Sequence, residues 1–261
     1  MNPERRQQLH ALLTDLGLDP CQPGGPGNSP QALAPIDEAL SHTSARLGRN
    51  HERLEFLGDA VLRLAAAVYL EQHHAALSVG RRSALRAQLV SDRWLAELGE
   101  RCGLERVWRI GAMAAGDKAG RATLLAELCE ALIGAIYLAW GGPQGGLLAV
   151  ERWLTPHWQR SSQELLHDPD RHNWKSALQE WSQARGLGLP SYECQQISSV
   201  HGDPRRFHCT ARLAIEQEAG GPAPESNGVA HVGEGWGPSR RAAEQAAAEQ
   251  LLAELRSAPA S

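Results

Sequence analysis

Residues 50–62 constrain the fold of this chain more than any other stretch. They spell NHERLEFLGDAVL, and the apolar run continues through residues 64–67. Glu52, Glu55 and Asp59 are three and four residues apart, so an α-helix would carry all three carboxylates on one face. Acids among apolar residues are costly to desolvate unless a positive charge neutralises them. A divalent cation is the simplest neutraliser, and oxygen-only ligands favour Mg²⁺ or Mn²⁺.

A second segment, residues 124–138, repeats this pattern. Glu127 and Glu130 lie one helical turn apart within a strongly apolar run. For either acidic pair alone, the ordinary interpretation is a solvated helix face with arginine partners. Two such segments favour a shared site, because their packing would bring up to five carboxylates together around one metal position.

Composition places the chain among ordinary globular proteins. Its 261 residues suffice for one large or two modest domains, and 42% of them are hydrophobic. We find no apolar run of membrane-spanning length and no signal-type N-terminus, so we expect no membrane partner. The five cysteines are Cys21, Cys102, Cys129, Cys194 and Cys209. They lack CxxC spacing, which argues against a zinc site or a disulfide framework and favours a reducing, cytoplasmic location.

The net charge of −4 is a mild argument against nucleic-acid binding, where a basic footprint is expected. The positive charges are unevenly distributed, however. Arginines occur in adjacent pairs at 81–82, 205–206 and 240–241, and Lys118 and Lys175 are the only lysines. Local basic patches are therefore compatible with the acidic total.

The pattern predicts an all-α domain over residues 4–145, with a further helix at 147–159 packed against it. Helical periodicity or helix-end signals occur at 4–18, 36–40, 50–71, 80–89, 92–100 and in the segment carrying Glu127 that ends near Trp140. Residues 20–35 and 108–120 have loop composition. A polar linker is predicted over 160–171, centred on Asp168, Pro169 and Asp170.

The remaining segment, residues 172–256, changes character and predicts a small α+β domain of the order α-β-β-β-α. Helices are expected at 174–185 and 240–255, and strands at 192–199, 207–215 and 229–233. A Gly- and Pro-rich connector occupies 217–227.

The segment HERLEFLGD at 51–59 closely resembles the signature of the ribonuclease III family, and ELCEALIG at 127–134 resembles that family's second acidic segment. The resemblance implies an endoribonuclease that hydrolyses double-stranded RNA with Mg²⁺, or Mn²⁺ as a substitute, and without a nucleotide cofactor. It implies 5′-phosphate and 3′-hydroxyl ends, short 3′ overhangs, a homodimer, and roles in rRNA and mRNA processing. The implied metal ligands are Glu55, Asp59, Glu127 and Glu130, with Asp59 and Glu130 most important for catalysis. Glu52 is implied as a peripheral, substrate-binding acid, and His42 as structural.

The second domain resembles the double-stranded-RNA-binding domain in three segments: KSALQE at 175–180, HGDPRRF at 201–207 and GWGPSRRAAEQ at 235–245. Such a domain reads the shape and phosphates of an A-form duplex. By matched position, the implied RNA contacts are Lys175, Gln179, Glu180, His201, Arg205, Arg206, Ser239, Arg240 and Arg241. His201 stands two residues earlier than the family's loop histidine, so Arg205 or Arg206 is expected to take over its contact.

One departure from the family pattern leaves alternatives open. The second acidic segment usually begins with Asp, and here that position is Glu127, whose extra methylene a rigid Mg²⁺ octahedron resists. We therefore expect reduced or Mn²⁺-preferring activity, and a double-stranded-RNA-binding protein with weakened cleavage is the alternative. A di-iron carboxylate enzyme is disfavoured, because the segment around Glu130 lacks the Glu-x-x-His pair such sites use.

Overall fold

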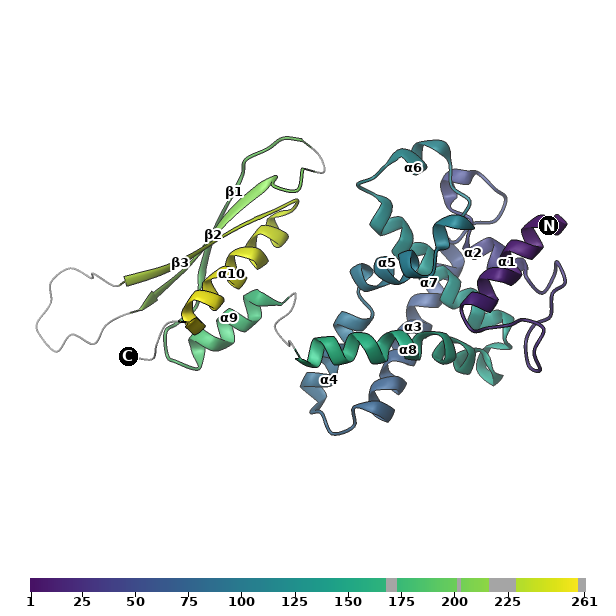
Figure 1. Ribbon diagram of the computed structural model, residues 1–261, viewed down its shortest axis with the longest axis horizontal. Helices are drawn as coiled ribbons and strands as arrows, with labels where there is room; N and C mark the ends of the chain where they lie inside the picture. The colour runs from purple at the N-terminus through teal and green to yellow at the C-terminus, as the bar shows by residue number, and fades with distance from the viewer. Residues whose placement is uncertain (168–172, 201–202, 216–228, 258–261) are drawn as a thin grey trace, which may run out of the picture. The chain divides into compact units, whose positions relative to one another are not determined.

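The computed structural model describes residues 1–167, 173–200, 203–215 and 229–257. The chain divides into two compact units, Met1–Glu164 and Leu165–Ser261 (Figure 1). The predicted linker residues 168–170, the connector 217–227 and His201 lie outside the described residues. Each unit is considered by itself.

The first unit is helical, as predicted. Its α-helices are α1 (Pro3–Asp15), α2 (Ala34–Ala39), α3 (Glu52–His73), α4 (Val79–Leu89), α5 (Asp92–Arg101), α6 (Ala112–Gly116), α7 (Arg121–Ala139) and α8 (Gly146–His167). Short 3₁₀ helices lie at Thr43–Ala45, Leu104–Arg106 and Gly142–Gln144. Helix α6 falls inside the segment 108–120, which composition alone indicated as a loop.

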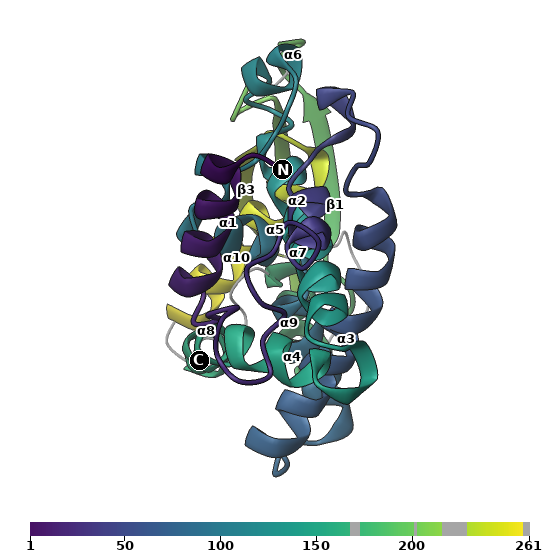
Figure 2. The same cartoon turned by 90° about the vertical axis from the view of Figure 1, so that its right-hand side faces the viewer.

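Helix α7 is the centre of the first unit. It packs against α2, α3 and α5 (Figures 1 and 2), and its apolar residues are buried on nearly every side, as expected for a helix surrounded by others. By length and composition alone, α7 would also be able to cross a membrane, which corrects the prediction that no run in the chain approaches that length. Its packing against three helices accounts for its apolar composition.

Helices α3 and α7 cross at two glycines. A Cβ atom at Gly58 would overlap the carbonyl of Glu130, and one at Gly134 would overlap the carbonyl of Leu54. The two backbones therefore touch where side chains would normally separate them. This close crossing sets the acids of α3 beside the acids of α7.

The second unit is a three-stranded antiparallel sheet with two helices, as predicted. Its elements are α9 (Trp174–Gln183), β1 (Ser191–Gln196), β2 (Phe207–Ile215), β3 (Val229–Gly237) and α10 (Arg240–Ser257). The strand order is β1-β2-β3. Both helices lie on one face of the sheet (Figure 1), and the core between them and the strands includes Leu178, Leu213 and Leu251.

Two predicted boundaries differ most from the structure. Helix α8 continues to His167 instead of ending at 159, because the polar residues that suggested a linker have internal partners. Ser162 Oγ lies 2.9 Å from Tyr69 Oη, and Trp94 Nε1 donates to Ser161 Oγ at 2.9 Å. Strand β3 runs on to Gly237 rather than ending at 233. Its glycines resemble a turn in the sequence, but at Gly235 a Cβ would overlap the backbone of α10.

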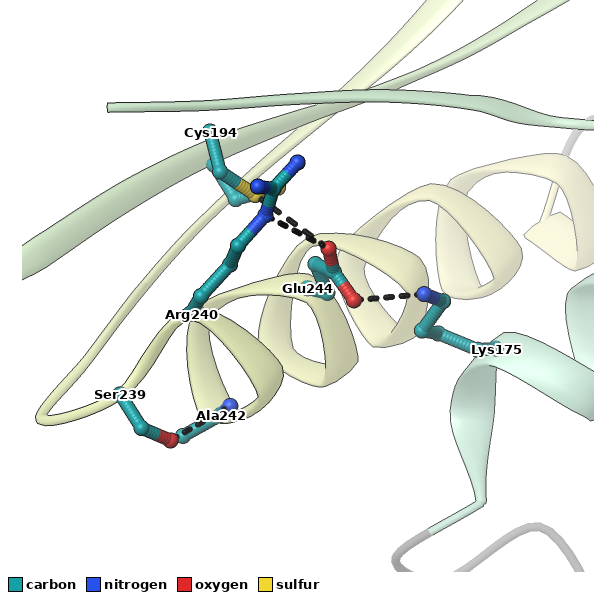
Figure 3. The surroundings of a disulfide bond; sticks show 7 residues. Lys175, Cys194, Ser239, Arg240, Ala242 and Glu244 are labelled. Carbon is teal, nitrogen blue, oxygen red and sulfur yellow. Dashed lines mark hydrogen bonds and ion pairs between the residues drawn. A yellow bond between two sulfur atoms is a disulfide. The ribbon is translucent and has the colours of Figure 1, made fainter. Parts of the chain in front are cut away.

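The cysteine prediction is wrong for one pair. Cys194 and Cys209 form a disulfide, with their Cα atoms 4.1 Å apart (Figure 3). They are 15 residues apart in sequence and become direct partners in the β1–β2 register. No CxxC spacing could signal this, because the pairing depends on strand alignment. Cys21, Cys102 and Cys129 are free.

Candidate metal centre and RNA-binding surface

All five predicted acids line one open cleft in the first unit. Glu52, Glu55 and Asp59 enter it from α3, and Glu127 and Glu130 from α7. The cleft has a volume of about 730 Å³ and is also lined by His42, Thr43, His51, Phe56 and Ala60. The structure thus brings the predicted site residues of the first domain together, with Glu52 exposed among them.

Asp59 and Glu130 define an oxygen-only part of the cleft. Burial raises the pKa of Glu130 to about 7, and the negative charges of Asp59, Glu55 and Asp92 add to the shift. Arg63, whose Nε donates to Asp59 Oδ1 at 2.8 Å, opposes the shift with the smallest of these effects. A half-buried carboxyl crowded by other carboxylates is the arrangement that a bound divalent cation relieves.

Glu127 faces a different set of neighbours. Its Oε2 lies 3.5 Å from His51 Nε2 and 3.9 Å from His42 Nε2. His51 Nε2 also lies 3.4 Å from Glu55 Oε2. Burial, Glu127 and Glu52 raise the pKa of Glu55 despite the opposing effect of His51. Glu55 therefore connects an oxygen-only part to a part that contains two imidazoles.

The two histidines are functional candidates that the sequence reasoning missed. His42 was assigned a structural role, and its Nδ1 indeed contacts Ser44, 2.7 Å from the hydroxyl and 3.2 Å from the amide nitrogen. Its Nε2 nevertheless points to Glu127. His51, only 2% exposed, precedes Glu55 by one helical turn, and that spacing was the available signal.

In the second unit, Lys175 is held within the domain. Its Nζ donates to Glu244 Oε2 at 2.5 Å (Figure 3). It also lies 4.5 Å from the centre of the Tyr192 ring. Lys175 thus connects α9 to α10. Gln179 and Glu180, also on α9, are exposed and remain accessible to a ligand.

The start of α10 has the features of a phosphate site. Ser239 Oγ accepts from the backbone N–H of Ala242 at 3.2 Å, which caps the helix (Figure 3). Arg240 and Arg241 are exposed beside this helix N-terminus, although Arg240 Nε also donates to Glu244 at 3.3 Å. Helix N-termini with adjacent arginines favour anions.

The two arginines before β2 differ in their surroundings. The Arg205 guanidinium is exposed and lies 5.0 Å from the ring centre of Trp236. Arg206 is partly buried over Phe207, and its Nε is buried without a hydrogen-bond partner. Of these two, Arg205 is the better placed to replace the predicted contact of His201.

Comparisons with known proteins agree with this division of the chain. Residues 35–154 match the family model described as Ribonuclease-III-like, and residues 174–255 match the double-stranded RNA binding motif. The chain is 45% identical to Ribonuclease 3 of Prochlorococcus marinus, covering 97% of this chain and 94% of that protein. It is 40% identical to Ribonuclease 3 2 of Synechocystis sp., with 95% and 91% covered. Among solved structures, the nuclease domain of ribonuclease III from Campylobacter jejuni matches 56% of this chain and 95% of its own length, with 28% identity and a TM-score of 0.47.

Proposed function

Because the chain belongs to the ribonuclease III family and is a double-strand-specific endoribonuclease, we propose that it hydrolyses RNA phosphodiesters in the cleft between α3 and α7. The products are fragments with 5′-phosphate and 3′-hydroxyl ends and short 3′ overhangs. The observation that carries this proposal is the convergence of Glu55, Asp59, Glu127 and Glu130 on one cleft.

The donors of this cleft fit a divalent cation, with Mg²⁺ proposed as the ion and Mn²⁺ as its substitute. Carboxylate oxygens suit these hard ions, and the pKa of Glu130 is raised first by burial and then by the negative charges of Asp59 and Glu55. Glu55, Asp59 and Glu130 would hold the ion, with Glu127 nearby. When bound, such a cation supplies an activated water and stabilises the charge that develops on the phosphate.

The residues of the chain prepare this site. The Glu130 carboxyl, with a pKa of about 7, must lose its proton before its oxygens serve as ligands. Asp59 is oriented by the hydrogen bond from Arg63 Nε. The direct contact of α3 with α7 at Gly58 and Gly134 holds the two pairs of acids in register.

The second unit binds the RNA duplex in this proposal. The capped N-terminus of α10, with Arg240 and Arg241, would contact phosphates across the major groove, and Gln179, Glu180 and Arg205 would contact the minor grooves. Lys175 contributes mainly by fixing α9 to α10 through Glu244.

We further propose that the enzyme works as a homodimer whose two clefts cut opposite strands. On α3, Phe56 is 84% exposed and Leu64 is 53% exposed. Large apolar side chains this exposed indicate a contact surface. Roles in rRNA and mRNA processing belong to the same proposal. A cytoplasmic location is part of it as well, but the Cys194–Cys209 disulfide removes the cysteine argument for a reducing compartment.

The decisive experiment is cleavage of a labelled RNA duplex of ~30 base pairs, longer than the ~16 that one such domain spans, with Mg²⁺, Mn²⁺ or EDTA. We expect metal-dependent products with short 3′ overhangs, lost in Asp59→Ala and Glu130→Ala. Cleavage that persists in EDTA or in both variants would refute the mechanism.

A double-stranded-RNA-binding protein with weakened cleavage is the second candidate. The observation that favours it is the position of Glu127, whose carboxylate faces His42 and His51. Tight binding of the same duplex without cleavage in either metal would establish this candidate instead.

A further inference from the structure

His42, His51 and Glu127 form a group whose geometry the proposed all-oxygen site does not explain. One ligand-capable atom of each lies within 4.8 Å of the other two. The separations of Glu127 Oε2 from the two Nε2 atoms, 3.5 and 3.9 Å, are longer than hydrogen bonds of this type. The polar atoms converge without bonding one another.

The 3.5 Å spacing matches the edge of a small coordination polyhedron, and the 3.9 Å spacing is longer than such an edge. Nitrogen and oxygen ligands lie about 2.0–2.1 Å from Zn²⁺ in tetrahedral sites, which separates neighbouring ligand atoms by roughly 3.4 Å. His51 Nε2 and Glu55 Oε2 are 3.4 Å apart, so Glu55 provides a fourth donor at the same spacing.

The surroundings of the His42 imidazole favour a ligand role, whereas Nδ1 of His51 is buried without a hydrogen-bond partner. Ligating histidines usually donate their second ring N–H to an acceptor, and Ser44 Oγ lies 2.7 Å from His42 Nδ1. The amide of Ser44 also faces this nitrogen, so ligation through Nε2 would exchange that contact for donation to the hydroxyl.

We propose that His42, His51 and Glu127, with Glu55 shared, form a second cation site that binds a borderline ion such as Zn²⁺ or Co²⁺. It differs in ligand type from the oxygen-only set of Glu55, Asp59 and Glu130, since imidazole suits zinc and its neighbours whereas carboxylates alone suit Mg²⁺. This site would also account for Glu127 in place of the usual Asp, because the longer glutamate side chain reaches the imidazoles.

The test is a Co²⁺ titration of the full chain followed by visible absorption, with Zn²⁺ as competitor. His10, Asp19 and Cys21 also lie close enough to hold a metal, so the parent protein carries Cys21→Ser to remove that soft ligand. We expect a tetrahedral Co²⁺ spectrum that Zn²⁺ abolishes. His51→Asn and Glu127→Gln should weaken binding by at least about tenfold. His73→Asn, at the exposed last residue of α3, should not. Unchanged binding in both site variants would overturn the proposal.

Two further measurements keep this test interpretable if a variant fails to fold. Glu127→Gln keeps the shape of a side chain that is 34% exposed, and its melting curve should match that of the parent. In the parent itself, Zn²⁺ should shift the imidazole ¹⁵N resonances of His42 and His51, and absence of both shifts would refute the site. The inference shares Glu55 and Glu127 with the proposed function, but its tests use no RNA. A chain that binds Zn²⁺ here without cutting RNA would refute only the function.

Discussion

The carboxyl of Glu130 couples the chemistry of the cleft to folding. Its pKa is raised from 4.5 to about 7, chiefly by burial and then by Asp59. A carboxyl whose folded pKa is raised stabilises the fold fully below its unfolded pKa and loses that contribution as pH rises through the folded value. Without a cation, this group should therefore favour the folded state at pH 4.5 more than at pH 7.5.

We predict that Glu130→Gln reduces this pH dependence of the unfolding free energy, measured in EDTA by urea titration. The difference between parent and variant should be on the order of 2 kcal/mol across this range, below the full value of the shift because the carboxyl is only half-buried. Parallel curves for the two proteins would contradict the assignment. In the parent protein, Mg²⁺ should restore the stability that is lost at the higher pH, because the cation binds the ionised form of the carboxyl.

Glu127 is expected to set the metal preference of cleavage. Glu127→Asp shortens the side chain and withdraws its carboxylate from His42 and His51 toward the family's usual arrangement. We predict a gain in Mg²⁺-supported rate relative to Mn²⁺ of up to about tenfold, within the range that displacements near 1 Å produce. The measurement is single-turnover cleavage in each metal, with Glu52→Asp as the matched shortening elsewhere in the cleft. Equal rates and metal ratios in parent and Glu127→Asp would contradict the prediction.

At the scale of elements, the crossing of α3 and α7 decides whether a site exists. Each helix alone carries a row of acids, and only their backbone contact at Gly58 and Gly134 makes the rows converge. Close-packed interiors do not accommodate an added methyl without displacement.

We predict that Gly134→Ala destabilises the protein by about 1–3 kcal/mol and lowers cleavage by up to ~10²-fold, because α7 must move away from α3. Chemical denaturation and single-turnover cleavage measure the two effects. Gly80→Ala is the control: Gly80 lies in α4 with no atom within 4 Å of its added Cβ, and it should be neutral or slightly stabilising. A Gly134→Ala protein with parental stability and rate would show that the crossing is not tight.

The start of α10 illustrates how charges divide between folding and binding. The Glu244 carboxylate accepts hydrogen bonds from both Lys175 and Arg240, beside the Cys194–Cys209 disulfide (Figure 3). Lys175 therefore serves the fold, whereas Arg241 remains exposed and accessible for the proposed phosphate contact. Residue type alone did not separate these roles.

At the scale of the whole molecule, the exposed apolar face of α3 bears on assembly. We predict that Phe56→Glu shifts the protein from dimer toward monomer. Phe56 is 84% exposed in the single chain, and the substitution would place a charge inside the proposed dimer interface. Sedimentation velocity over a concentration series measures the change. Val79→Glu, at a residue 71% exposed on α4, is the control that should leave the mass unchanged. A Phe56→Glu protein with parental mass would place the interface elsewhere.

Much of this architecture followed from the sequence. The helical periodicity of the first domain, the α-β-β-β-α order of the second and the acid spacing of residues 50–62 and 124–138 are local patterns, and they predicted the elements and the acids of the cleft. The predicted end of β3 was wrong because, in the sequence, glycines that allow close packing cannot be distinguished from glycines of a turn. The predicted end of α8 was wrong because the hydrogen-bond partners of Ser161 and Ser162 lie far away in the sequence.

Relations between distant segments were decided only by the tertiary structure. The Cys194–Cys209 bond depends on strand register, the engagement of Lys175 depends on how α10 lies against α9, and the grouping of His42 and His51 with Glu127 depends on the α3–α7 crossing. Periodicity along a chain specifies which face a residue occupies on its own element. It does not specify which face of another element will meet it, because that is set by the packing of the whole domain.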